Sequence, residues 1–124
     1  MIIGIGVDII HTKRLERWLG NEGLLRRYFH PQELETVRLR GPGALQSLAA
    51  RFAAKEAVVK ALGRKLGGFS LKDIASINDK DGRPVLHLYG DVETLFRRLG
   101  GVSAHLSLSH DGPLSVAMVV LEGE

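Results

Sequence analysis

The segment from residue 51 to residue 62 constrains the fold most strongly, because it predicts a helix with charges on a side that should be buried. It is rich in Ala, Val, Leu and Phe, which is typical of a helix packed in a core. At 3.6 residues per turn, Glu56 and Lys60 lie above one another, beside Phe52 and Val59. A buried carboxylate or ammonium needs a partner. The two residues therefore either pair with each other or belong to a functional site, and this segment alone leaves both open.

The length and composition of the chain indicate one globular domain over residues 1–124. Hydrophobic residues make up 44% and charged residues 25%, which are ordinary values for a soluble protein. No apolar run is long enough to span a membrane, and the N-terminus lacks the basic region of a signal peptide. The absence of cysteine excludes disulfides and thiolate sites. We therefore expect a cytoplasmic protein with no membrane partner.

The positive charge of the chain indicates acidic partners. The formal net charge is +3 and the pI is near 9.5. Aromatic residues are few and do not alternate with basic ones, and no nucleic-acid-binding signature is present, so we expect an acidic protein rather than a nucleic acid. Much of the positive charge lies early in the chain, at Lys13, Arg14, Arg17, Arg26, Arg27, Arg38 and Arg40.

The hydrophobic pattern predicts the α+β class, with a mostly antiparallel sheet packed against a long central helix. Thr12 and Asp91 are expected to cap short helices, and Gly63 to end the long one. The predicted strands are residues 2–10, 74–77, 84–89, 102–109 and 114–121, and the predicted helices are residues 13–19, 24–29, 31–40, 44–62 and 91–99.

Asp8 is the second unusual charge. In a strand, alternate residues share a face, so Gly4, Gly6 and Asp8 point the same way. The two glycines leave room for another backbone or a ligand on the face that carries the carboxylate. Asp8 could equally cap the strand or pair with a basic residue.

Asp8 and Glu56 together predict more than either alone, if the fold brings them close. Two buried carboxylates repel each other unless a cation lies between them or one is protonated. Mg²⁺ suits such a pair, because it binds through one or two carboxylates and completes its shell with water and phosphate oxygens. Lys60, one turn beyond Glu56, could then contact a phosphate.

A third cluster is Ser107-Leu108-Ser109-His110, before a predicted turn. Neighbours on a strand point to opposite faces, so Ser109 and His110 would not form a direct nucleophilic pair. A histidine near a turn that meets solvent is the simpler interpretation of this cluster alone.

These three motifs resemble the holo-acyl-carrier-protein synthases, the short, single-domain type of 4′-phosphopantetheinyl transferase. The matching residues are Ile3-Gly4-Ile5-Gly6-Val7-Asp8-Ile9 followed by Arg14, then Arg51-Phe52-Ala53-Ala54-Lys55-Glu56-Ala57 with Lys60, then Ser107-Leu108-Ser109-His110. The resemblance covers nearly the whole chain, and the three separated motifs occur in the expected order and spacing.

The resemblance implies an enzyme of lipid biosynthesis that transfers 4′-phosphopantetheine from coenzyme A to a serine of apo-acyl carrier protein and releases adenosine 3′,5′-bisphosphate. It implies that Asp8 and Glu56 hold Mg²⁺ and that Lys60 contacts the phosphates of coenzyme A. Arg51 and His110 are expected near the nucleotide phosphates and Pro84 near the adenine. Glu56 is our candidate for accepting the serine proton.

The resemblance also implies a docking surface and an oligomer. Arg14, with Lys13 and Arg17 nearby, would bind the acidic carrier protein, and the chain would form a homotrimer with active sites between subunits. Relatives often carry a Gly-Thr-Gly-like loop where this chain has Arg64-Lys65 after Gly63, so the contacts of that loop cannot be transferred. Two other functions stay open on the residues alone: a non-catalytic basic module that binds an acidic protein or nucleic acid, and a metal-dependent hydrolase.

Overall fold

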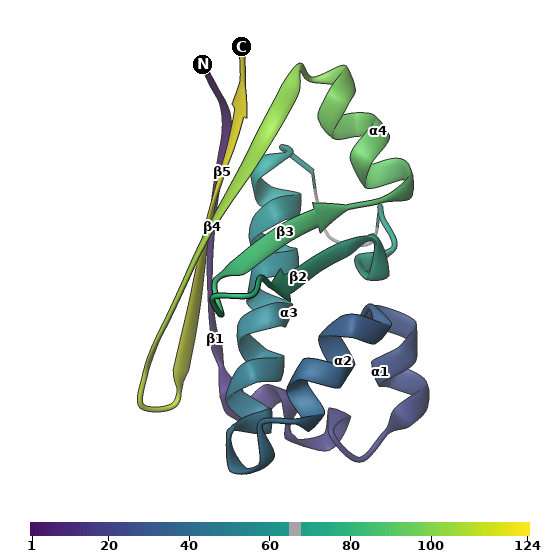
Figure 1. Cartoon of the computed structure of the whole chain (residues 1–124), viewed down its shortest axis with the longest axis vertical. Coiled ribbons are helices and arrows are strands. Elements are labelled where there is room, and N and C mark those ends of the chain that lie inside the picture. Colours follow the sequence, from purple (N-terminus) through teal and green to yellow (C-terminus); the bar gives the residue numbers. More distant parts are fainter. Residues whose placement is uncertain (65–67) are drawn as a thin grey trace.

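The computed structural model describes residues 1–64 and 68–124 (Figure 1). Within these ranges the chain forms, in order, β1 (Ile2–His11), the 3₁₀ helix η1 (Thr12–Trp18), α1 (Glu22–Tyr28), α2 (Pro31–Arg38), the 3₁₀ turn η2 (Gly41–Gly43), α3 (Ala44–Ala61), the 3₁₀ turn η3 (Leu71–Asp73), β2 (Ile74–Asn78), β3 (Pro84–Leu88), α4 (Gly90–Arg98), β4 (Gly101–Asp111) and β5 (Leu114–Gly123).

The long helix α3 is the centre of the fold. Its apolar residues Ala53, Ala57 and Val58 are fully buried. The antiparallel sheet β1–β5–β4 runs along one side of α3, and the antiparallel pair β2–β3 lies on another with α1 and α2 nearby (Figure 1). The predicted α+β class, with antiparallel strands packed on a long helix, is confirmed. The strands form two sheets rather than one.

Strand β1 touches α3 through the backbone at its two glycines. A Cβ atom at Gly4 would lie 2.0 Å from the carbonyl oxygen of Ala61, and one at Gly6 would lie 1.9 Å from that of Ala57. The room that the glycines leave is therefore filled by the backbone of α3. Asp8, next on the same face of β1, is buried beside the helix.

We expect Gly6→Ala to lower the free energy of unfolding by about 3 kcal/mol, because the added methyl group meets helix backbone that cannot rotate away. Urea denaturation measures the loss. Gly20→Ala is the matched control, since a Cβ atom there meets nothing within 4 Å. Equal losses for the two variants would contradict the close strand–helix contact.

The other face of β1 is apolar and exposed. Ile5, Val7 and Ile9 are 57%, 56% and 58% exposed. Met118, opposite Val7 on β5, is 46% exposed and extends this surface, which we call the outer sheet face. An exposed apolar surface that continues across two strands is typical of an interface.

Two predicted helix caps are wrong. Thr12 is itself the first residue of a 3₁₀ helix and donates its backbone N–H to Pro113 O at 2.8 Å, so it remains tied to the sheet. Asp91 lies inside the first turn of α4, because the chain turns at Gly90 (φ 56°) and the helix begins one residue early. Gly63 follows α3 with φ 71°, as predicted for its end.

None of the helices in the described ranges is long and apolar enough to cross a membrane.

Candidate active site

The first cluster of predicted site residues lies where β1 meets α3. The Lys60 ammonium is 3.0 Å from Asp8 Oδ1 and donates to Val7 O at 3.1 Å. Lys60 thus pairs with Asp8 rather than with Glu56, one turn away. The other oxygen of Asp8, Oδ2, is buried and has no hydrogen-bond partner among the described residues. Asp8 therefore offers one unused oxygen beside the helix.

Glu56 lies beside Asp8. Burial, and after it the adjacent Asp8 carboxylate, raise the pKa of Glu56 to about 7, while the charges of Arg14 and Lys60 act in the opposite direction. Two adjacent carboxyl groups of this kind either share a proton or bind a cation. No cluster of three or more His, Cys, Asp or Glu suited to a metal occurs in the described ranges. The pair, with the unused Asp8 oxygen, fits a cation such as Mg²⁺ that takes its other ligands from water and phosphate.

The raised pKa of Glu56 predicts that the protein without metal loses stability as the pH rises. Between the unfolded pKa of about 4.5 and the folded pKa of about 7, the native state binds more protons than the unfolded state. The stabilisation is therefore complete below about pH 4.5 and lost as the pH rises through about 7. Thermal melts in EDTA across this window should show a decline for the wild type that Glu56→Gln lacks. Parallel curves for the two proteins would contradict the raised pKa.

The predicted docking residues share one hollow. Lys13, Arg14 and Arg17 line a depression of about 470 Å³ with Trp18 and Phe52 at its apolar wall. Its side chains come from η1 and from α3, which place it next to the Asp8–Glu56 pair.

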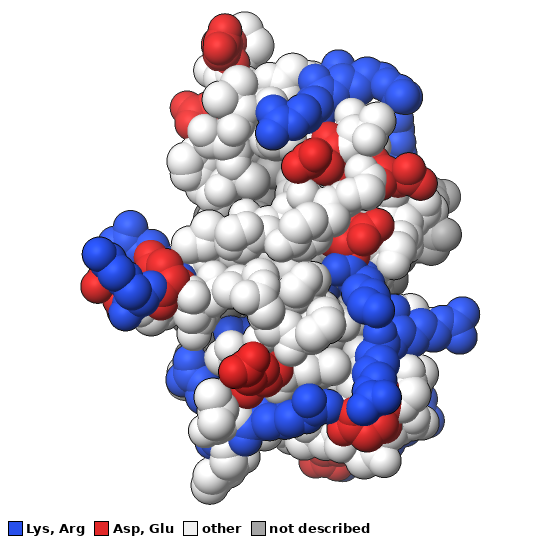
Figure 2. All heavy atoms as spheres, turned by 45° about the vertical axis from the view of Figure 1, so that its right-hand side comes forward, with Lys and Arg blue, Asp and Glu red and all other residues white. Residues whose placement is uncertain are grey.

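Other basic residues of the first third of the chain are partly neutralised. Lys and Arg side chains are spread over the face that carries α1 and α2, with acidic side chains between them (Figure 2). Arg26 and Arg38 both pair with Glu22, at 3.5 and 2.7 Å. These arginines therefore belong to an exposed ion-pair cluster rather than to a continuous basic surface.

Arg51 and His110 meet in a second hollow, of about 250 Å³, which we call the Arg51–His110 hollow. Arg51 is only 4% exposed, and burial is the main cause that lowers its pKa. Its guanidinium donates to Ser47 Oγ at 2.7 Å, Ser47 O at 3.3 Å and Asn78 Oδ1 at 3.2 Å. Ten residues line the hollow: Arg40, Gly43, Gln46, Ser47, Ala50, Arg51, Leu108, Ser109, His110 and Ser115.

Pro84 is not among the residues that line this hollow, but it lies on the same side of α3. It begins β3 directly opposite Asn78, whose amide oxygen accepts from Arg51.

The predicted site residues thus form two groups, which lie on different faces of α3 in a single copy of the chain. Glu56 and Lys60 lie on the face of α3 toward β1, whereas Arg51 lies on the face toward β2. Asp8 is on β1 and His110 is on β4, which are the two edges of the three-stranded sheet.

A buried ion pair next to the site was not predicted from the sequence. Lys55 Nζ lies 2.6 Å from Glu33 Oε1, and both side chains are fully buried. Lys55 also donates to Leu71 O at 2.9 Å and to Ile74 O. The only signal in the sequence was a lysine within a run of alanines, since its partner comes from another helix.

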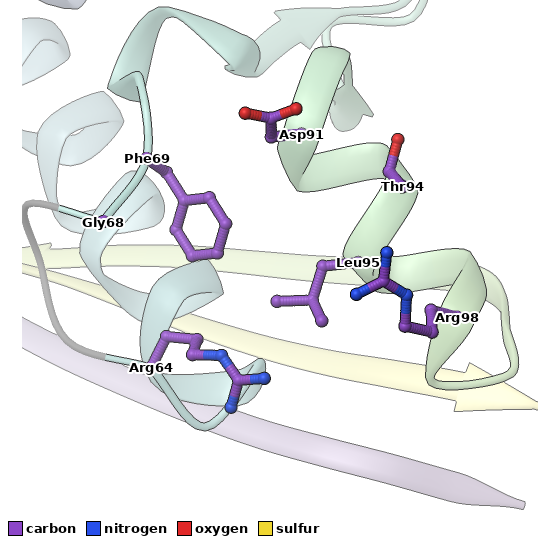
Figure 3. A pocket seen from close by; sticks show the side chains of 7 residues that line it. All are labelled: Arg64, Gly68, Phe69, Asp91, Thr94, Leu95 and Arg98. Atoms are coloured by element: carbon purple, nitrogen blue, oxygen red, sulfur yellow. The ribbon is translucent and has the colours of Figure 1, made fainter.

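A larger hollow, of about 600 Å³, contains none of the predicted residues (Figure 3). It lies between the end of α3 and α4, with the Arg64 and Arg98 side chains around Phe69 and Leu95. Lys65 and Gly67, in the loop that departs from the family pattern, lie outside the described residues.

The comparisons with known proteins define the class of this fold and site. The family model of the 4′-phosphopantetheinyl transferase superfamily matches residues 4–117. The chain belongs to this family.

Within the family, the similar proteins share one name. The holo-[acyl-carrier-protein] synthase of Treponema denticola is 51% identical over 123 residues, which cover 99% of this chain and 100% of that protein. The crystal structure of the Neisseria meningitidis holo-[acyl-carrier-protein] synthase has a TM-score of 0.87 at 33% identity, over 98% of this chain and 99% of that one. A Bacillus anthracis holo-(acyl-carrier-protein) synthase in complex with CoA (3′,5′-ADP) has a TM-score of 0.81 at 36% identity, over 100% and 99%.

These findings confirm the resemblance recognised in the sequence and the activity that it implied. The chain is a transferase of the holo-acyl-carrier-protein synthase type, which moves phosphopantetheine from coenzyme A to apo-acyl carrier protein.

Proposed function

We propose that Asp8, Glu56 and Lys60 form the reaction centre of this transferase and that the two carboxylates hold Mg²⁺. The observation that carries the proposal is the buried Asp8 Oδ2 without a partner, next to a Glu56 whose pKa is raised to about 7. Mg²⁺ bound there would neutralise the coenzyme A pyrophosphate and polarise the attacked phosphorus.

The transfer itself needs positioning and charge neutralisation more than a protein nucleophile. The serine oxygen of the carrier protein forms a bond to the phosphorus that bears the pantetheine arm. The bond from this phosphorus to the bridging oxygen breaks, and that oxygen leaves with adenosine 3′,5′-bisphosphate. Glu56, as a carboxylate, accepts the serine proton. Lys60, fixed by Asp8, donates to a phosphate oxygen.

The nucleotide end of coenzyme A binds Arg51 and His110, with Pro84 near the adenine. The Arg51–His110 hollow contains two arginines, a histidine and three serines and no acidic residue, which suits a phosphate. The acidic carrier protein docks on Arg14, Lys13 and Arg17, whose hollow borders the carboxylate pair.

We further propose that the chain is a homotrimer of single 4′-phosphopantetheinyl transferase domains, each spanning residues 1–124. The apolar outer sheet face, with Ile5, Val7 and Ile9 more than half exposed, supports an interface. A neighbouring copy would also explain why the nucleotide residues and the carboxylate pair are separate in one chain, since the interface can bring one group to the other. A cytoplasmic location stays a prediction of the sequence.

In the deciding experiment, the chain is incubated with apo-acyl carrier protein, coenzyme A and Mg²⁺, and the mass of the carrier protein is measured by mass spectrometry. We expect a gain of one phosphopantetheine group, which EDTA prevents. No gain with several apo carrier proteins would exclude the transferase and favour a non-catalytic basic module. Consumption of coenzyme A without any carrier protein would indicate a hydrolase.

A further inference from the structure

Ser115 is a buried serine whose hydroxyl makes no hydrogen bond within residues 1–64 and 68–124. The residue is 0% exposed. A buried hydroxyl without a partner costs about 1–3 kcal/mol in stability, whereas an alanine at the same place costs nothing of this kind. Such a group indicates a partner that binds from outside.

The strand register places Ser115 in the Arg51–His110 hollow. It is paired with Ile10 on one side and with His110 on the other. Residues directly opposite on antiparallel strands point to the same face, with Cβ atoms about 4.5–5.5 Å apart. Ser115 shares the inner face of β5 with the fully buried Ala117, which faces α3. Ser115 therefore lines the same hollow as His110 and the buried Arg51.

Arg51 offers a second unused donor in the same hollow. Its terminal nitrogens donate to Ser47 and Asn78, but its Nε is buried and has no partner in the described part of the chain. Of the four buried side-chain atoms without a partner in the described ranges, Arg51 Nε and Ser115 Oγ belong to residues that line this one hollow. Two unpaired donors beside basic side chains, with no acidic residue in the lining, suit an anion with several acceptor oxygens.

We propose that Ser115 is a further ligand-binding residue of this site and that its hydroxyl donates a hydrogen bond to a nucleotide phosphate held by Arg51 and His110. The proposal rests on the proposed function, which places the nucleotide end of coenzyme A in this hollow. His110 is exposed and is paired with Ser115 across the strands, so a fast change of its rotamer opens the hollow beside Ser115 and lets both residues reach one phosphate.

Isothermal titration of the protein with adenosine 3′,5′-bisphosphate tests the proposal. We expect Ser115→Ala to weaken binding about 10-fold, because a hydrogen bond to a charged group is lost. Ser70→Ala is the matched control, since Ser70 is an exposed serine before η3 that does not line the hollow, and it should change binding less than about twofold. Titration with adenosine 3′- and 5′-monophosphate should confine the loss to one of them.

A second measurement separates ligand binding from a structural role. Without ligand, Ser115→Ala should melt at the same temperature as the wild type or higher, because an unsatisfied hydroxyl is removed. Binding within twofold of the wild type, an equal loss with both monophosphates, or a lower melting temperature without ligand would each overturn the proposal. A wild type that binds no bisphosphate would overturn it together with the nucleotide placement, while the carrier-protein mass gain would still report transfer independently.

Discussion

Glu56→Gln should reduce phosphopantetheine transfer by about 10²–10⁴-fold while the fold stays intact. Glutamine has the size of glutamate but neither its negative charge nor its ability to accept a proton. Only the Asp8 carboxylate then remains at the β1–α3 contact. The variant therefore lacks both the expected second metal ligand and the expected base. Stability should not fall at neutral pH, because the repulsion between Asp8 and Glu56 is also removed.

The measurement is the rate of carrier-protein mass gain with saturating coenzyme A and Mg²⁺, together with a thermal melt of each variant. Glu35→Gln is the matched control, since Glu35 is an exposed residue of α2. Full activity of Glu56→Gln in the presence of Mg²⁺ would show that Glu56 is not essential. Activity that returns with higher Mg²⁺ would assign Glu56 to metal binding rather than to proton transfer.

The sequence was sufficient for those parts of the site that depend on local periodicity. Strand alternation placed Gly4, Gly6 and Asp8 on one face, and the close contact of both glycines with α3 agrees with that prediction. Helix periodicity placed Glu56 and Lys60 one turn apart. The closeness of Asp8 and Glu56 was only assumed, and it follows in the structure from the glycine contact that brings β1 onto the helix.

Features that depend on a partner from elsewhere in the chain were not predictable. The sequence could not show whether Lys60 pairs with Glu56 or with Asp8, because Asp8 is 52 residues away. The role proposed for the Ser115 hydroxyl depends on the strand register and on Arg51, which comes from another element, so it could not be predicted from the local sequence. The caps at Thr12 and Asp91 failed for the same reason, since contacts with Pro113 and a turn at Gly90 decided where these helices begin.

The buried ion pair next to the site connects the fold to the Arg51–His110 hollow. Glu33 on α2 accepts from Lys55 on α3 and from the backbone N–H of Ser76 on β2, the latter at 2.9 Å. The same strand β2 carries Asn78, which holds Arg51. One carboxylate therefore fixes the positions of three elements around the residues proposed to bind the nucleotide.

Lys55→Met should lower the free energy of unfolding by about 3–5 kcal/mol, the second large effect that we expect. The ammonium is fully buried and donates to Glu33 and to two backbone carbonyls, of Leu71 and Ile74. Methionine fills similar space but leaves the Glu33 carboxylate buried without its counter-charge. Because a domain of this size has a total stability of about 5–15 kcal/mol, the loss is a large fraction of it.

Urea denaturation measures this loss, with Arg38→Met as the control. Arg38 pairs with Glu22 at 2.7 Å, but both side chains are more than half exposed, so breaking that pair should cost less than about 1 kcal/mol. The double variant Glu33→Gln with Lys55→Met should recover part of the stability, because no buried charge is then left alone. A loss for Lys55→Met as small as that for Arg38→Met would show that the buried pair contributes no more than an exposed one. If Lys55→Met does not fold, the double variant still tests the explanation. When the damage comes from an unpaired buried carboxylate, removing both charges leaves a more stable protein than removing the lysine alone.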